Sequence, residues 1–257
     1  MAVITLPLRY QAMLSSGPDD NVEANIAPID ETFEVDPDDA ALVLVDTWNK
    51  HHVLSHMHRT ADVMRERIAP LLPEVRRAGI PLIYSPSPEV AERYPQWQRR
   101  FGELPPPGPH PHDDWPPRDL RARFPRRPGE MPTDYAGPLP DWWHWDAVHE
   151  SIAPKPDDHV VARGSELHEV LRELRRSVLF YVGFAANICV LHRDYGVLAM
   201  GQRGYVPILL RDCTTAIETR DTLADFTTTR LAIQDVERRY FTADSADLIS
   251  ALRMNGG

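Results

Sequence analysis

The stretch VLFYVGFAANICV, residues 178–190, decides the fold class of this 257-residue chain. Its first part, residues 178–184, is almost wholly apolar, which is typical of a strand buried on both faces of a parallel sheet. Small residues and one asparagine follow, and an amphipathic pattern then runs from Cys189 to about residue 201. The sequence therefore predicts a buried strand that turns into a helix, with a cysteine at the turn.

The position of Cys189 suits nucleophilic chemistry. A helix start places free N–H groups and a positive dipole end beside the thiol, a setting that lowers a cysteine pKa and supplies donors for an oxyanion. The alternative is a buried, inert cysteine that packs as a small hydrophobic residue. The spacing alone leaves both possibilities open.

A second buried run ends in an acid. Residues 41–45, ALVLV, are followed by Asp46. A carboxylate at the carboxyl end of a parallel strand lies on the edge where open α/β sheets bind ligands. We therefore expect Asp46 and Cys189 to present a base and a nucleophile to one crevice.

Strand and helix patterns alternate along the rest of the chain, which implies a parallel sheet covered on both faces. The sequence predicts a three-layer α/β/α fold with a mostly parallel, roughly six-stranded Rossmann-like sheet. The expected strands are 41–45, 80–84, 159–162, 178–184, 205–210 and 239–242. The expected helices are 60–78, 166–176, 189–201, 221–236 and 245–252.

We expect residues 1–257 to form a single domain with two appendages. Residues 1–38 are predicted to be an extended N-terminal arm with one edge strand. Residues 86–145 form a proline- and tryptophan-rich insertion, and five of the six tryptophans lie between residues 97 and 145. Long ordered loops of this kind are commonly lids, so we expect Trp142 and Trp143 to line a substrate pocket, a subunit contact being the alternative.

The composition argues against several partners. The formal net charge is −10 and no basic run occurs, which disfavours nucleic acid and anionic membranes. No signal peptide and no apolar run of ~20 residues is seen, and two cysteines make no disulfide framework. We expect a cytoplasmic protein that acts on a small-molecule substrate, binds neither nucleic acid nor membrane, and forms a homo-oligomer, either a dimer or a tetramer.

Three motifs resemble those of the isochorismatase-like cysteine hydrolases. In LVLVDTWN, residues 42–49, Asp46 and Asn49 match the family pattern, while Trp48 stands where glutamine is usual. YVGFAANICV places Cys189 at the family's nucleophile. GYVPILLRDCTTAIE is similar to the family's following strand, with Cys213 in place of an alanine. The resemblance spans roughly residues 38–252 apart from the insertion.

The resemblance implies a hydrolase that cleaves a C–N bond of a small amide, imide or carbamoyl compound without a cofactor. Cys189 would form a thioester and Asp46 would act as the base. The family's unusual, often cis, peptide would fall at Ala185–Ala186 and turn a backbone N–H toward the oxyanion. The alternatives are vinyl-ether hydrolysis of an isochorismate-like substrate, which needs the aspartate but not the cysteine, and a non-catalytic binding or assembly protein.

The family's third residue is a lysine, and here the sequence departs from the pattern. The matching run is HVVAR, residues 159–163, so Arg163 stands at the lysine position. Arg163 can offer a positive charge to Asp46 but cannot shuttle protons as lysine does. We predict that Arg163 faces Asp46, with Trp48 and Asn49 in the substrate pocket.

Four histidines follow the first predicted strand: His51, His52, His56 and His58. The nicotinamidases of this family bind a metal through an Asp-x-His motif after the second strand, and no such motif follows residue 84. We therefore expect no metal, and we interpret the histidines as part of a partly solvated loop.

Overall fold

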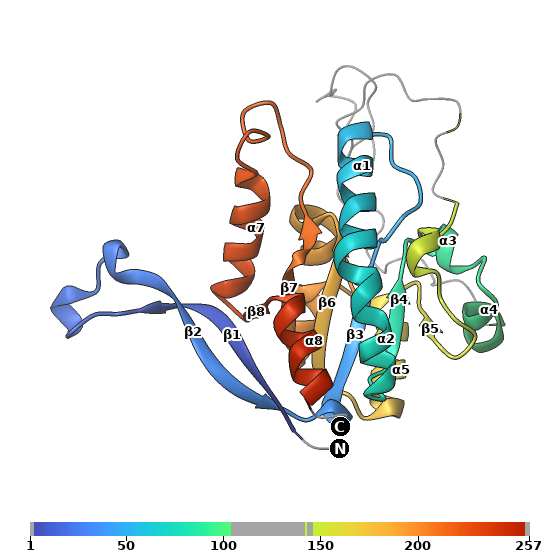
Figure 1. Ribbon diagram of the computed structural model, residues 1–257, viewed down its shortest axis with the longest axis horizontal. Helices are drawn as coiled ribbons and strands as arrows, with labels where there is room; N and C mark the ends of the chain where they lie inside the picture. Colours follow the sequence, from blue (N-terminus) through green and yellow to red (C-terminus); the bar gives the residue numbers. More distant parts are fainter. Residues whose placement is uncertain (1–2, 104–141, 143–145, 255–257) are drawn as a thin grey trace, which may run out of the picture.

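The computed structural model describes residues 3–103, 142 and 146–254. Its centre is an eight-stranded sheet in the order β2-β1-β8-β7-β6-β3-β4-β5 (Figure 1). The strands are β1 (Ile4–Met13), β2 (Ile26–Val35), β3 (Ala40–Val45), β4 (Leu82–Ser85), β5 (His159–Val160), β6 (Val178–Phe184), β7 (Val206–Thr215) and β8 (Phe241–Ala243). All six predicted strands are present, and those from β3 to β8 run parallel to one another.

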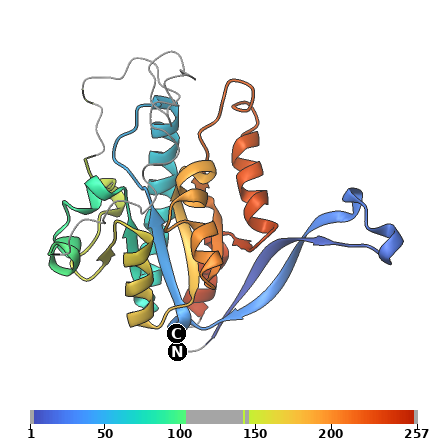
Figure 2. The same ribbon diagram turned by 180° about the vertical axis from the view of Figure 1, so that it is seen from behind.

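Helices cover both faces of the sheet, which confirms the predicted three-layer fold. The helices are α1 (Leu54–Val63), α2 (Ala69–Arg77), α3 (Pro88–Ala91), α4 (Pro95–Phe101), α5 (Gly164–Leu174), α6 (Val197–Gln202), α7 (Thr227–Glu237) and α8 (Ser245–Met254). Helices α1, α2 and α8 lie on one face, and α5, α6 and α7 lie on the other (Figures 1 and 2). None of the helices in the described ranges is long and apolar enough to cross a membrane.

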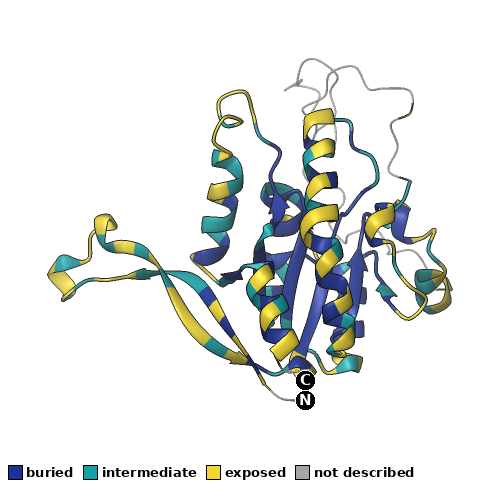
Figure 3. Cartoon of the chain, in the orientation of Figure 1, coloured by how far each residue is buried: buried dark blue, intermediate teal, exposed yellow. Residues whose placement is uncertain are grey.

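The central strands carry the core. Every residue of β3 is buried, and β6 is buried from its second residue onward (Figure 3). These two strands have helices on both faces, which is why their sequences are continuous apolar runs rather than alternating ones.

The N-terminal arm contributes two strands to the sheet, where the sequence predicted one edge strand. β1 and β2 pair antiparallel from Ile4↔Val35 to Met13↔Ile26, and the hairpin extends away from the body (Figure 1). Pro7 lies within β1, where it cannot donate a ladder hydrogen bond. The structure accommodates Pro7 because β1 pairs with β8 through Arg9↔Thr242 alone.

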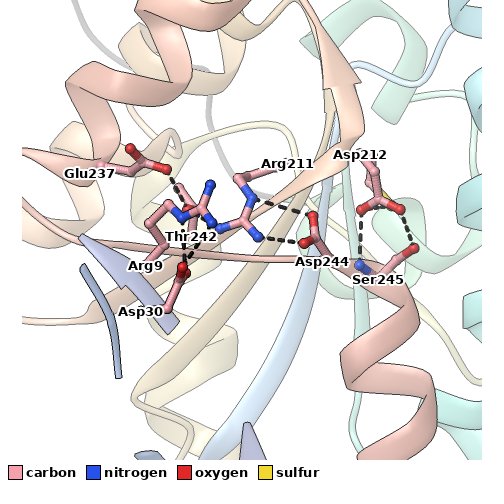
Figure 4. Close-up of polar contacts among 9 residues, drawn as sticks. Arg9, Asp30, Arg211, Asp212, Glu237, Thr242, Asp244 and Ser245 are labelled. Atoms are coloured by element: carbon pink, nitrogen blue, oxygen red, sulfur yellow. Dashed lines mark hydrogen bonds and ion pairs between the residues drawn. The ribbon is translucent and has the colours of Figure 1, made fainter. Parts of the chain in front are cut away.

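Polar contacts fix the base of the hairpin to the body (Figure 4). Arg9 forms a bidentate pair with Asp30 across the hairpin, with N···O distances of 2.9 and 2.8 Å. Thr242 in β8 donates to Glu237 at the end of α7 at 2.9 Å and accepts from Arg211 of β7 at the same distance. Gln11 of β1 donates to the same Glu237 at 2.8 Å, and this bond joins the hairpin to the end of α7.

The helix predicted from Thr60 begins earlier, at Leu54. Thr60 does not cap it. Its hydroxyl donates to the carbonyl of Met57 at 2.9 Å, inside the helix. A π-helical turn, η4 (Met64–Ile68), joins α1 to α2, and α2 contains Pro73. The predicted helix 60–78 is therefore divided by a π-helical turn, one of the usual causes of local distortion in helices.

The start of the predicted insertion is more regular than its sequence suggested. Two short helices, α3 and α4, occupy its first described part, and each has proline in its first turn, where the missing N–H costs little. The greater part of the predicted lid, residues 104–141 and 143–145, lies outside the described residues.

The order of the strands defines one switch point. The chain runs from β3 to β4 and β5 in one direction, then returns to place β6 on the other side of β3 before continuing to β7 and β8. In open α/β sheets, ligands bind beyond the carboxyl ends of the strands at such a point. β3 and β6 are the two strands that precede Asp46 and Cys189.

Candidate active site

Asp46 follows β3 and is wholly buried. Its φ of 46° lies in the left-handed region, which non-glycine residues rarely adopt and which is often found at functional sites. Gly183 lies opposite Val45 in the β3–β6 register, and a Cβ on it would be 1.9 Å from the Val45 carbonyl oxygen. The strands can approach closely here only because residue 183 is glycine, and this approach brings the two strand ends together.

Cys189 lies in a π-helical turn, η7 (Ala186–Val190), directly after β6. The carbonyl of Ala185 accepts from the N–H groups of Ile188 and Val190 at 3.0 and 3.2 Å, which fixes the turn. The Cys189 side chain lies beside the Asp46 carboxylate, close enough for each group to shift the pKa of the other. The structure thus brings together the two residues that the sequence placed at separate strand ends.

Burial sets the protonation of this pair. Burial raises the pKa of Asp46 to about 6, against the opposing effect of the Arg193 charge and smaller effects of Cys189 and the Ser87 backbone. Burial, together with the neighbouring Asp46 charge, raises the pKa of the Cys189 thiol well above its usual range. The expectation that the helix start lowers this pKa is wrong, because desolvation and a nearby carboxylate outweigh the turn's donors. At neutral pH the pair rests as a thiol and a carboxylate.

The positive charge beside Asp46 comes from Arg193, which the sequence analysis missed. Arg193 Nε lies 3.4 Å from Asp46 Oδ2, and the positive charge of the guanidinium also acts on Cys189, whose pKa it lowers. The helix predicted over 189–201 is broken after residue 192 by a turn that ends at Gly196, whose N–H donates to the Arg193 carbonyl. The spacing of four residues from Cys189 was the available signal, since such residues are neighbours on a helix.

Arg163 is not where the sequence predicted. Its guanidinium pairs with Glu166 at 2.8 Å and with Glu92 at 3.6 Å. Helix α5 starts at Gly164, immediately after Arg163, so Glu166 of the first turn lies within reach of the Arg163 side chain. The prediction that Arg163 is the cation facing Asp46 is therefore wrong, and Arg193 occupies that place.

The cis peptide lies one bond earlier than expected. It joins Phe184 to Ala185, and not Ala185 to Ala186. Ala186 is already the first residue of η7, and the Ala185 carbonyl is held by that turn. The change of direction between strand and helix therefore falls before Ala185.

Trp48 and Asn49 hold the end of the insertion against the loop after β3. Trp48 is buried and forms a bridge with Val148. The Asn49 side-chain oxygen accepts from the Ala147 N–H at 3.2 Å, and the Asn49 N–H donates to the Ala147 carbonyl. These contacts position a neighbouring segment, and whether either residue also touches substrate stays a prediction. Trp142 is 45% exposed, and Trp143 lies outside the described residues.

The histidine segment is not the solvated loop that we expected. His51 and His56 are buried, and His51 stacks on His52 with ring centroids 4.4 Å apart. Burial and neighbouring positive groups lower the pKa of His51 and of His56 to about 3, so both rings are neutral at pH 7. The His56 ring meets Phe184 edge-on, with 6.4 Å between centroids. Because these imidazoles are neutral, they can be buried among other side chains and away from water.

Comparison with known proteins agrees with this geometry. The family model described as the isochorismatase domain matches residues 40–238. A cysteine hydrolase from Pseudomonas syringae pv. phaseolicola 1448A is 17% identical with a TM-score of 0.55, over 86% of this chain and 95% of that one. An isochorismatase-like hydrolase from Alkaliphilus metalliredigens is 13% identical with a TM-score of 0.50, over 82% and 98%.

No protein of curated function matches the sequence. The two structural likenesses extend over nearly the whole of each solved chain and concern the fold. The family model covers more than half of this chain and includes both Asp46 and Cys189. The chain therefore belongs to the isochorismatase-domain family of hydrolases.

Proposed function

We propose that this protein hydrolyses a C–N bond of a small amide, imide or carbamoyl compound through a thioester on Cys189. The observation that supports this most strongly is the wholly buried Asp46 carboxylate against the Cys189 thiol at the switch point of the sheet. A buried carboxylate with a pKa of about 6 is ionised at neutral pH and basic enough to take a proton.

The reaction follows from these two groups. Asp46 takes the thiol proton as the sulfur attacks the carbonyl carbon, and backbone N–H groups of the cysteine turn hold the oxyanion. The C–N bond then breaks, and the proton on Asp46 passes to the leaving nitrogen. Water attacks the thioester, again losing a proton to Asp46, and the C–S bond breaks to release the acid and restore the thiol.

The alternatives have less support. Vinyl-ether hydrolysis does not use a cysteine, so it leaves the contact between Cys189 and Asp46 without a role. A non-catalytic protein was favoured by the missing lysine, but Arg193 supplies a positive charge to Asp46. The cytoplasmic location, the homo-oligomer and the pocket role of Trp142 and Trp143 stay predictions.

The test is to trap the thioester. The protein is incubated with a panel of primary amides, cyclic imides and N-carbamoyl compounds, ammonia or amine release is measured, and acid-quenched samples are digested for peptide mass spectrometry. We expect the active compound to leave its acyl group on the Cys189 peptide, removable by hydroxylamine, while the Cys213 peptide from the same digest stays unmodified. Turnover with an acyl group on neither cysteine at any quench time would argue against the covalent route.

A further inference from the structure

Arg193 is the cation of the site. Arg193 forms an ion pair with Asp46, and Cys189, Tyr195 and the Ser87 backbone are near enough to interact with it electrostatically. Tyr195 is buried, and its pKa is raised by burial and by the Asp46 charge, so it stays neutral. Among the described residues, no other cation lies within ion-pairing distance of Asp46.

We propose that Arg193 is a catalytic residue that holds the Cys189 thiolate as Asp46 removes its proton, and that Arg163, at the family's lysine position, takes no part. This inference rests on the proposed function, because it concerns the same nucleophile. It assigns the positive charge of the site to a residue from a different element, the turn after η7, rather than to the segment before α5.

The charges explain why the cation is needed at this point. Before proton transfer the negative charge is on Asp46, and afterwards it is on the Cys189 sulfur. The Arg193 guanidinium is paired with Asp46 and its charge also acts on the neighbouring Cys189 sulfur, so one ion pair can replace the other and no unpaired charge appears in the buried site. Arginine stays charged throughout, which leaves Asp46 as the proton carrier.

Loss of the guanidinium would also disable the base. Arg193 lowers the pKa of Asp46, which burial otherwise raises. Without that charge the pKa of Asp46 would rise further, more of the carboxyl would be protonated at neutral pH, and a protonated carboxyl cannot accept the thiol proton. The reactivity of Cys189 should therefore depend on Arg193 in a pH-dependent way that a purely structural role would not produce.

Alkylation of Cys189 tests this without a known substrate. The full chain is treated with iodoacetamide from pH 5 to pH 9, and labelling is followed by peptide mass spectrometry with Cys213 as the internal reference. The variants are Arg193→Gln, Arg193→Lys and, as the matched control, Arg163→Gln. Thermal unfolding of each variant checks that it is folded, and the partly exposed position of Arg193 favours this.

We expect labelling of Cys189 in the unsubstituted protein to rise through pH 6 and then level off. Arg193→Gln should slow it about tenfold or more at pH 7, and should move the rise by about one pH unit or more to higher pH, since one pKa unit is a tenfold change. Arg193→Lys should keep part of the rate because it keeps the charge, and Arg163→Gln should behave as the unsubstituted protein.

Two results would overturn the proposal, and they differ. In the first, Cys189 is reactive but its labelling rate and pH profile are unchanged in Arg193→Gln, or are impaired to the same extent in Arg163→Gln. Arg193 would then have no specific role, while Cys189 would remain the nucleophile. A Cys189 no more reactive than Cys213 in the unsubstituted protein at every pH would overturn the proposed function, and this inference with it.

Discussion

The chain contains two buried cysteines in matching settings, and only one has the surroundings of a nucleophile. Cys189 follows β6 and Cys213 lies near the end of the neighbouring strand β7. Each has a carboxylate beside it, Asp46 or Asp212, and in each case burial raises the pKa of the thiol. Position at a strand end and a nearby acid are therefore shared features that do not distinguish the two sites.

The two sites differ in the hydrogen bonds that their carboxylates already accept. Asp212 accepts from the Ser245 N–H at 2.9 Å and from its hydroxyl at 2.5 Å, and so caps helix α8 (Figure 4). Asp46 keeps one oxygen, Oδ1, buried without a hydrogen-bond partner among the described residues, and its other oxygen meets Arg193. A thiol becomes a candidate nucleophile where the carboxylate has an unused oxygen and a cation is at hand.

Replacing each cysteine by alanine should show the largest contrast. Cys189→Ala removes the attacking sulfur, so we expect turnover of any C–N substrate to fall by about 10³-fold or more. Cys213→Ala removes only a packed side chain, so turnover should stay within about twofold while stability falls slightly. Steady-state kinetics on both variants measure this, and equal losses would mean that the two sites are not functionally distinct.

Replacing Asp46 by asparagine should make the protein less active and more stable. The folded pKa of about 6 exceeds the ordinary value of 3.8, so the folded state binds more protons between these values and stability falls as pH rises through them. Above pH 6 the loss of stability that comes from burying the ionised carboxylate is complete. Asp46→Asn should then raise the free energy of unfolding at pH 7.5 by up to about 3 kcal/mol while turnover falls about 10²-fold.

Urea unfolding of both proteins at pH 7.5 and pH 4 measures this effect. The increase in the free energy of unfolding caused by Asp46→Asn should be smaller at pH 4, where the carboxyl of the folded protein is already protonated. A variant that is less stable at pH 7.5 would mean that the ion pair with Arg193 outweighs the cost of burial.

Replacing Asp212 should give the opposite and smallest result. Asp212→Ala removes the acceptor that caps α8, and loss of such a cap costs about 1 kcal/mol. We expect a lower free energy of unfolding, unchanged turnover, and an unchanged pH profile of Cys189 alkylation. Ser245→Ala serves as a partial control, because it removes only one of the two bonds. A loss of turnover in Asp212→Ala would mean that the contact between Asp212 and the start of α8 contributes to the reaction.

The sequence predicted those parts of the site that depend on buried strands. The strands before Asp46 and Cys189 are continuous apolar runs, and parallel strands end at one edge of the sheet, so the pair followed from pattern alone. The sequence did not predict the role of Arg193. Its position depends on a break in the helix after residue 192, and the apolar pattern of the sequence continues past that break. Arg163 matched by position, but the early start of α5 placed it beside Glu166.

The N-terminal hairpin has a consequence for how copies of this protein meet in concentrated solution. β2 is the outermost strand, so its free edge is a potential template for pairing with another chain. That strand contains Pro28, which lacks an N–H, and three acids, Asp30, Glu31 and Glu34. Like charges would oppose a second β2 laid against it. Pro28 and these acids are therefore expected to protect the protein against edge-to-edge aggregation.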